Sequence, residues 1–216
     1  MGIPTPPAAP SLPTELPSLT EFAHRLGVVP HRASAGATAA LAVALAADLV
    51  AQVAESSPGW EGHQGALAQA DAVRDRAVAR SCEVAVAYGL LVEALRGAIA
   101  DPGADRQSTS SRGTSPPLDS TTLGRELVGA ADLLLEIADT ACDCAALAVV
   151  VAKAGDTVVR ADATAAAVLA ASAAEMAAHL VEVNLLACAQ QERTARARQL
   201  AGAAAEFRSV ALGVMR

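Results

Sequence analysis

Apolar residues recur at every third or fourth position along most of this chain, with polar residues between them. Such spacing is typical of helices that bury one face. Five long stretches keep the pattern, at about residues 34–55, 60–100, 123–154, 157–191 and 191–212. A capping box, the sequence SLTE at residues 18–21, predicts a further short helix that ends near residue 26. Since no strand-like alternation of useful length occurs, the pattern predicts an all-α protein of about six helices.

Proline and small polar residues mark the boundaries of this helical domain. Six prolines fall within residues 4–17, so we expect residues 1–17 to form a disordered extension. Residues 101–122 are rich in Ser, Thr, Pro, Gly and Asp, a composition typical of a flexible loop. The sequence therefore predicts a single helical domain over residues 18–216, with a flexible loop at 101–122.

Small apolar residues dominate the composition and indicate how the helices pack. Hydrophobic residues make up 53% of the chain but aromatic residues only 2%, because Ala and Val supply most of the apolar positions. Alanine is the best helix former and loses almost no side-chain entropy on folding. Since such side chains let helix axes approach closely, we expect a tightly packed, Ala-rich bundle.

The charge and the cysteines narrow the class of protein. A net charge of −7 argues against a nucleic-acid partner, because nucleic acid requires a basic face. None of the four cysteines forms a CxxC pair, so we expect reduced thiols in a cytoplasmic protein.

Two segments are apolar and long enough to imitate membrane spans, at residues 35–53 and 161–183. Asp48 interrupts the first, and the second contains Asp162 and Glu175. Alanine is also barely hydrophobic enough to insert into a bilayer. We therefore expect both segments to be buried helices, with no membrane partner.

Several short motifs occur in a fixed order along residues 18–190. They are SLTEF at 18–22, ASAGAT at 33–38 before an Ala-rich helix, the pair Ala87-Tyr88, the turn GD at 155–156 followed by Asp162, and LVEVNL at 180–185. In order and spacing they resemble the cyclodeaminase/cyclohydrolase family. These are the methenyltetrahydrofolate cyclohydrolases and the C-terminal domain of formiminotransferase-cyclodeaminase. The resemblance implies a homodimer that acts on a tetrahydrofolate derivative and needs no cofactor.

The chain also departs from the pattern of that family. Val84 stands where the family has an Asp in its long helix, and the glycine-rich element keeps only Gly36. Leu180 replaces the first Asn of the last motif, and Met176 stands where a small Gly is usual. The segment VAES at 53–56 lacks the Lys of the corresponding polar element.

These departures bear on the chemistry that the resemblance implies. In the family's reactions, water attacks a cationic methenyl carbon, or N10 attacks a formimino carbon and ammonia leaves. Both need a positioned acid/base group, worth roughly 10²–10⁴-fold in rate. Val84 cannot transfer protons, and Glu83 lies about 100° round the helix from it. We therefore expect Asp162 or Glu175 to be the catalytic group.

Four residues are predicted to bind the substrate. Gly36 opens a helix and, with Arg32, could hold the anionic tail of a folate, although an ordinary N-cap at Ser34 explains the same residues. Tyr88, the only tyrosine, can stack on a pterin ring or fill a gap in the core. Asn184 can contact the ligand or be a satisfied core amide.

A row of carboxylates recurs at helical spacing, formed by Asp132, Glu136, Asp139 and Asp143. Di-metal bundles build their site from Glu-x-x-His pairs on two helices, and no residue of this row belongs to such a pair. We expect a solvated helix face here and no metal.

Three functions remain open from the sequence. The first is a divergent enzyme of one-carbon tetrahydrofolate metabolism, which hydrolyses methenyltetrahydrofolate or deaminates formiminotetrahydrofolate. The second is a pseudoenzyme, a non-catalytic relative that binds a ligand or a protein partner, and Val84 favours it. The third is an unrelated Ala-rich bundle, which would follow if Gly36 and Tyr88 did not border a common pocket.

Overall fold

The computed structural model describes residues 35–100, 122–186 and 188–214. Within these ranges the chain forms α-helices and no strands, which confirms the all-α class. The helices are α2 (Ala35–Glu55), α3 (His63–Ala100), α4 (Thr122–Ala154), α5 (Arg160–Leu185) and α6 (Gln191–Val214). Five helices are thus observed against about six expected. The expected helix at 18–26 and the extension at 1–17 lie outside the described residues, as does nearly all of the loop at 101–122.

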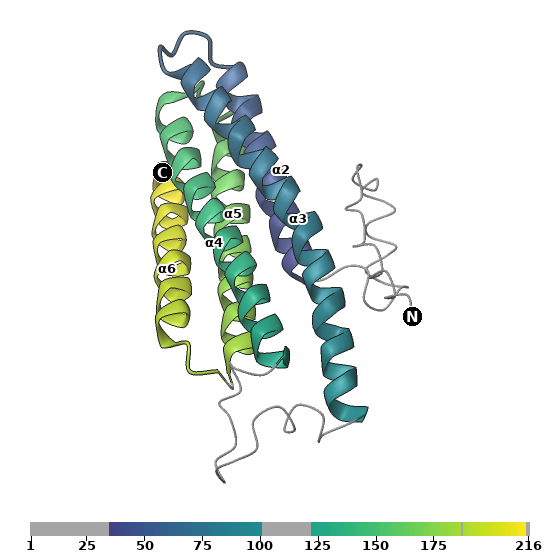
Figure 1. The fold of residues 1–216 in the computed structure, drawn as a ribbon. Coiled ribbons are helices and arrows are strands. Elements are labelled where there is room, and N and C mark those ends of the chain that lie inside the picture. Colours follow the sequence, from purple (N-terminus) through teal and green to yellow (C-terminus); the bar gives the residue numbers. More distant parts are fainter. Residues whose placement is uncertain (1–34, 101–121, 187, 215–216) are drawn as a thin grey trace, which may run out of the picture.

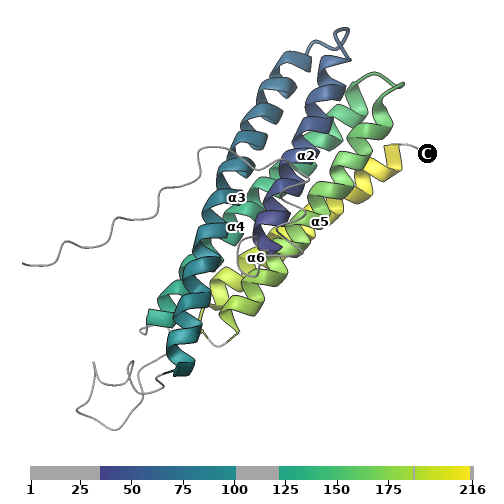
Figure 2. The same ribbon diagram turned by 90° about the vertical axis from the view of Figure 1, so that its right-hand side faces the viewer.

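The helices α2 to α5 form a four-helix bundle, with α6 packed along its outside. Neighbouring helices run in opposite directions, and α2 packs on α3, α3 on α4, α4 on α5 and α5 on α2 (Figure 1). The short connections at residues 56–62 and 155–159 favour this antiparallel order. In both views α3 extends past the start of α2 (Figures 1 and 2). Helix α6 packs on α4 and α5.

Alanine fills the centre of the bundle, as the composition predicted. Nine of the twelve buried residues of α5 are Ala. The largest fully buried side chains of the described residues are Ile137, Val43, Val50, Val53, Val151, Val181 and Cys144. Because most of its buried side chains are alanine, α5 can pack closely on α2, α4 and α6 at once.

Two loops meet at the end of the bundle where α2 and α4 finish. The Ser57 hydroxyl donates to the Val53 carbonyl at 2.6 Å and accepts the Asp156 amide at 2.8 Å. A Cβ on Gly155 would lie 2.7 Å from the Val151 carbonyl oxygen and 3.1 Å from Ser57 Oγ. Only glycine therefore fits at this close approach of the two loops.

The structure shortens one expected helix at both ends, since α5 was expected over 157–191. At its start, the Asp156 carboxylate accepts the Val158 amide at 2.9 Å, and the Asp156 carbonyl accepts the Val159 amide. This turn delays the helix to Arg160. At its end the chain reverses after Leu185, so that α6 can pack back on α4 and α5.

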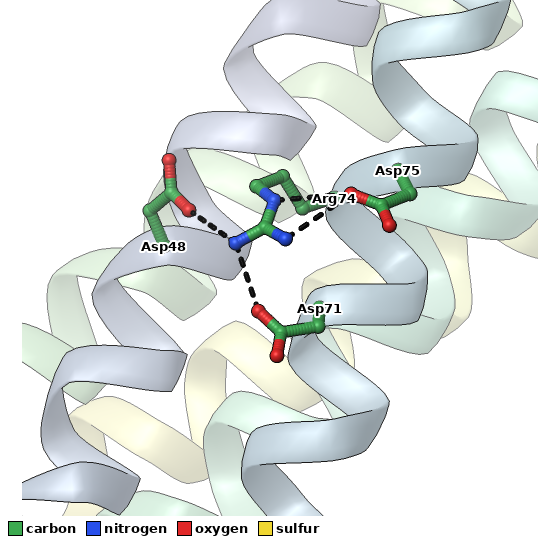
Figure 3. Close-up of polar contacts among 4 residues, drawn as sticks. All are labelled: Asp48, Asp71, Arg74 and Asp75. Carbon is green, nitrogen blue, oxygen red and sulfur yellow. Dashed lines mark hydrogen bonds and ion pairs between the residues drawn. The ribbon is translucent and has the colours of Figure 1, made fainter.

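The two membrane-like segments are α2 and α5. By length and composition each could cross a bilayer, and 56% of the most apolar window of each is buried within the described structure. A core helix of a packed bundle passes the same test, so the finding does not by itself indicate a membrane span. Asp48, which interrupts α2, has a cationic partner. Arg74 of α3 reaches it at 3.5 Å and also pairs with Asp71 at 2.8 Å and Asp75 at 3.1 Å (Figure 3).

Candidate functional site

A cavity of about 220 Å³ lies between the four helices of the bundle. Its lining residues are Ala35, Gly36, Val84, Ala87, Tyr88, Leu91, Ala130, Leu134, Leu180 and Asn184. It is therefore placed at the end of the bundle where α2 begins and α5 ends (Figures 1 and 2). Each of the four helices supplies part of the wall.

Helical spacing explains why these residues face one space. On α3 the lining residues follow the spacing i, i+3, i+4 and i+7, from Val84 to Leu91. On α4 and on α5 the lining pairs are four residues apart, Ala130 with Leu134 and Leu180 with Asn184. Residues at these spacings share a helix face. The small side chains of Ala35, Gly36, Ala87 and Ala130 leave the space between the faces unfilled.

The walls are apolar, and two side chains offer hydrogen bonds. Val84, Leu91 and Leu134 are buried. Tyr88 is 37% exposed, so its ring stands at the rim and does not fill a closed core gap. Asn184 is partly buried and carries two donors and an acceptor. No charged side chain is among the described residues that line the cavity.

Three of the predicted binding residues come together here. Gly36, Tyr88 and Asn184 border the same cavity although they lie on three different helices. Since Gly36 and Tyr88 border a common cavity, the observation that would have favoured an unrelated Ala-rich bundle is not made. Val84 and Leu180, the two apolar replacements noted in the sequence, line the cavity with them. Arg32 lies outside the described residues.

The structure does not bring the two predicted catalytic carboxylates to this cavity. Asp162 is in the first turn of α5 and Asn184 in the last, which places them about 33 Å apart at 1.5 Å of rise per residue. Glu175 is exposed and accepts a hydrogen bond from Arg208 of α6 at 2.9 Å. The motif order could not reveal this separation, because neighbouring motifs on one helix can lie at opposite ends of a bundle.

A second, larger groove of about 510 Å³ lies between α3, α4 and α6. Glu136 and Asp139 of the α4 carboxylate row line it, and each of the four carboxylates of the row has an arginine partner from α3 or α6. The ion pairs are Asp132 with Arg193 at 2.6 Å, Glu136 with Arg80 at 2.5 Å, Asp139 with Arg196 at 3.0 Å and Asp143 with Arg76 at 3.0 Å. The row is thus a solvated face that also holds α3 and α6 to α4. Within the described ranges no group of three or more His, Cys, Asp or Glu side chains could hold a metal ion.

One of the four cysteines differs from the others in its burial. Cys144 is fully buried, whereas Cys82, Cys142 and Cys188 are partly exposed. Burial raises the pKa of the Cys144 thiol from its ordinary 9.0 to about 12, and the nearby Asp143 adds to this. Because the thiolate is the reactive form, Cys144 is protected from alkylation in two ways: reagents cannot reach the buried thiol, and its raised pKa keeps it protonated.

Iodoacetamide at pH 8 is expected to alkylate the three partly exposed cysteines of the native protein and to spare Cys144. Peptide mass spectrometry with and without urea measures this directly. The folded-state pKa of Cys144 exceeds the unfolded one, so the unfolded chain ionises first and the free energy of unfolding falls as the pH rises above about 9. Native alkylation of Cys144 as fast as that of Cys82 would show that the α4 core opens readily.

Comparison with known proteins finds a sequence match over part of the chain and a similar fold over most of it. Residues 117–203 match the sequence model of the formiminotransferase-cyclodeaminase family. The fold is similar to the crystal structure of formiminotetrahydrofolate cyclodeaminase from Thermotoga maritima, with a TM-score of 0.70 at 17% sequence identity. That likeness covers 92% of this chain and 98% of the other. Comparison with curated proteins gives no significant match.

The family match spans α4, α5 and the first half of α6, including the segment that carries Leu180 and Asn184. The structural likeness extends the agreement in fold to the remaining helices. Both findings support the resemblance to the formiminotransferase-cyclodeaminase family that the order of the sequence motifs indicated.

Proposed function

We propose that this chain is a ligand-binding member of its family with a role in one-carbon tetrahydrofolate metabolism, and that the reduced folate binds at the cavity of Gly36, Tyr88 and Asn184. The observation that carries the proposal is the meeting of these three residues, from three helices, at one apolar cavity. The match of residues 117–203 to the family model and the similarity in fold to a cyclodeaminase support the folate-related role.

The side chains at the cavity suit recognition of a ring. Tyr88 is partly exposed and lines the cavity, and a flat ring can stack on its aromatic side chain. The Asn184 amide can donate to and accept from the edge of a pterin, which carries donors and acceptors side by side. The apolar walls formed by α3 and α4 exclude water from the part of the ligand that enters.

Catalysis is the second candidate function, and the cavity supports it less well. Hydrolysis of a methenyl bridge or loss of ammonia from a formimino group needs an acid/base group within hydrogen-bond reach of the reacting atoms. The described lining offers Val84 where a carboxylate is expected, and both Asp162 and Glu175 lie elsewhere. An enzyme of this kind would have to draw its acid/base group from outside this lining, for example from a partner subunit.

Two measurements test the proposal together. We expect tetrahydrofolate to bind the purified protein in isothermal titration calorimetry, and Asn184→Leu to weaken that binding at least tenfold, because ligand polar groups would be left unpaired. We expect methenyltetrahydrofolate to lose its near-ultraviolet absorbance no faster than in an enzyme-free blank.

The matched control is Val183→Ala, which changes an exposed neighbour of Asn184 that does not line the cavity. It should leave the affinity unchanged. Absence of binding, or equal losses in both variants, would contradict the proposed site. Hydrolysis well above the blank would favour the enzyme, and mutagenesis of Glu175 and Asp162 would then identify the proton donor.

A further inference from the structure

The cavity that supports the proposed function has no charged side chain among the described residues of its lining. The described lining consists of alanines, a glycine, a valine, leucines, one tyrosine and one asparagine. None of these side chains carries a formal charge near neutral pH. A ligand group that enters therefore meets dipoles, and no counter-charge, from the described residues of the lining.

Glu83, the charged residue next to Val84 on α3, forms an ion pair outside the cavity. Glu83 precedes Val84, but it lines the separate groove between α3, α4 and α6 and not the cavity. There it forms an ion pair with Arg80, which also pairs with Glu136 of α4. Since successive residues point about 100° apart round a helix, Glu83 cannot turn into the cavity without rotating α3.

The helix ends at the cavity do not supply a net charge either. Gly36 is in the first turn of α2, where a helix carries a partial positive charge, and Asn184 is in the last turn of α5, where it carries a partial negative charge. The two helices pack on each other in opposite directions. Their partial charges therefore largely offset one another at this end of the bundle.

The size of the cavity limits what can enter. About 220 Å³ is less than the roughly 300–1,000 Å³ of sites that enclose a drug-sized ligand. One ring system fits, while the rest of a folate stays outside the four helices. An ionised group buried without a partner is strongly disfavoured, whereas a neutral group with satisfied hydrogen bonds is not.

We propose that the cavity selects an uncharged ring and rejects a cationic one, so that its ligand is a neutral reduced pterin and not a methenyl cation. This inference rests on the proposed function for the identity of the ring. The charge selection itself follows from the lining. Val84 is the residue that determines it, because a carboxylate at this buried position would supply the counter-charge that a cationic ring needs.

The test compares two folates that share the same tail and differ in ring charge. The probes are 5-formyltetrahydrofolate, with a neutral ring, and 5,10-methenyltetrahydrofolate, with a cationic ring. Dissociation constants are measured by ultrafiltration within minutes of mixing, and absorbance confirms that the methenyl form is intact. We expect the wild-type protein to bind the neutral probe at least tenfold more tightly. Equal affinity, or tighter binding of the cation, would overturn the inference.

Variants then locate the selection at Val84. Val84→Asp should shift the ratio of the two affinities toward the cation by at least tenfold, whereas the uncharged Val84→Asn should leave it near the wild-type value. Equal shifts in both variants would contradict a charge effect. Should circular dichroism show that Val84→Asp does not fold, Leu180→Asp places a carboxylate on another wall of the cavity, formed by α5, where the side chain is partly exposed.

A folate-independent pair separates the two proposals. Quinoline is neutral at pH 7.5, and N-methylquinolinium is a cation of similar shape. Ligand-detected NMR should show quinoline bound more tightly, with the preference reduced in Val84→Asp. If this pair discriminates while neither folate binds, the charge selection stands and the proposed folate function fails. If neither pair binds, both proposals are overturned.

Discussion

Replacing Ala170 by leucine is expected to lower the free energy of unfolding by about 3 kcal/mol, because overpacking a closely packed core forces side chains and backbone apart. Ala170 is fully buried in the middle of α5. Its helix packs on α2, α4 and α6 at once, so a larger side chain has no direction in which to relax. Urea denaturation followed by circular dichroism at 222 nm measures the change.

Ala165→Leu on the same helix is the matched control. Ala165 is exposed, and a surface substitution of this kind is usually within about 0.5 kcal/mol of the wild type. Similar losses of unfolding free energy in the two variants would mean that the helices around α5 are not closely packed. A large loss confined to Ala170 would confirm that alanine here sets the distance between helix axes.

The opposite change, Ile137→Ala, is expected to cost about 3–4 kcal/mol, since it removes buried methyl groups and leaves a cavity. Ile137 on α4 is 1% exposed and the largest fully buried side chain of the described residues. An alanine-rich core has few large side chains, so each one carries a larger share of the buried apolar surface. The same urea titration gives the value.

Two controls bracket this prediction. Ile137→Val should cost about 0.5–1.5 kcal/mol, because only one methyl group is lost. Val150→Ala, on the same helix but 49% exposed, should change little. A loss below 1 kcal/mol for Ile137→Ala would show that the surrounding alanine helices close the gap, which rigid bundles do not do.

Two of the departures from the family pattern, Val84 and Leu180, contribute to the apolar lining of the cavity. Val84 of α3 and Leu180 of α5 line the same cavity as Tyr88 and Asn184. Retention of the stacking and amide groups, with loss of the ionisable ones, suits binding better than proton transfer. The expected homodimer remains a prediction, because the structure describes a single chain.

The arginines of α6 give the carboxylate row of α4 a second role, in helix packing. The carboxylates of α4 were expected to form only a solvated face, yet Arg193 and Arg196 of α6 bind two of them. Arg198 and Arg208 reach Glu182 and Glu175 of α5. Each such pair is partly exposed and therefore contributes little to stability by itself. Together they orient α6 on α4 and α5.

The periodicity of apolar residues was enough to determine the helical class and most helix limits. It predicted 34–55 and 123–154, and the structure has Ala35–Glu55 and Thr122–Ala154. Helix formation is local, because hydrogen bonds and side-chain contacts join residues three or four positions apart. Where a turn depended on a contact, as between Asp156 and Ser57, the sequence predicted the wrong limit for α5.

The composition of the site was decided by the tertiary structure. Gly36, Tyr88 and Asn184 are far apart along the chain and meet only because α2, α3 and α5 pack in alternating directions. Asp162 and Glu175 share a helix with Asn184, yet the rise of that helix carries Asp162 about 33 Å away. Motif order records which residues a helix carries. Which of them face one cavity depends on the end of the bundle at which each helix places them.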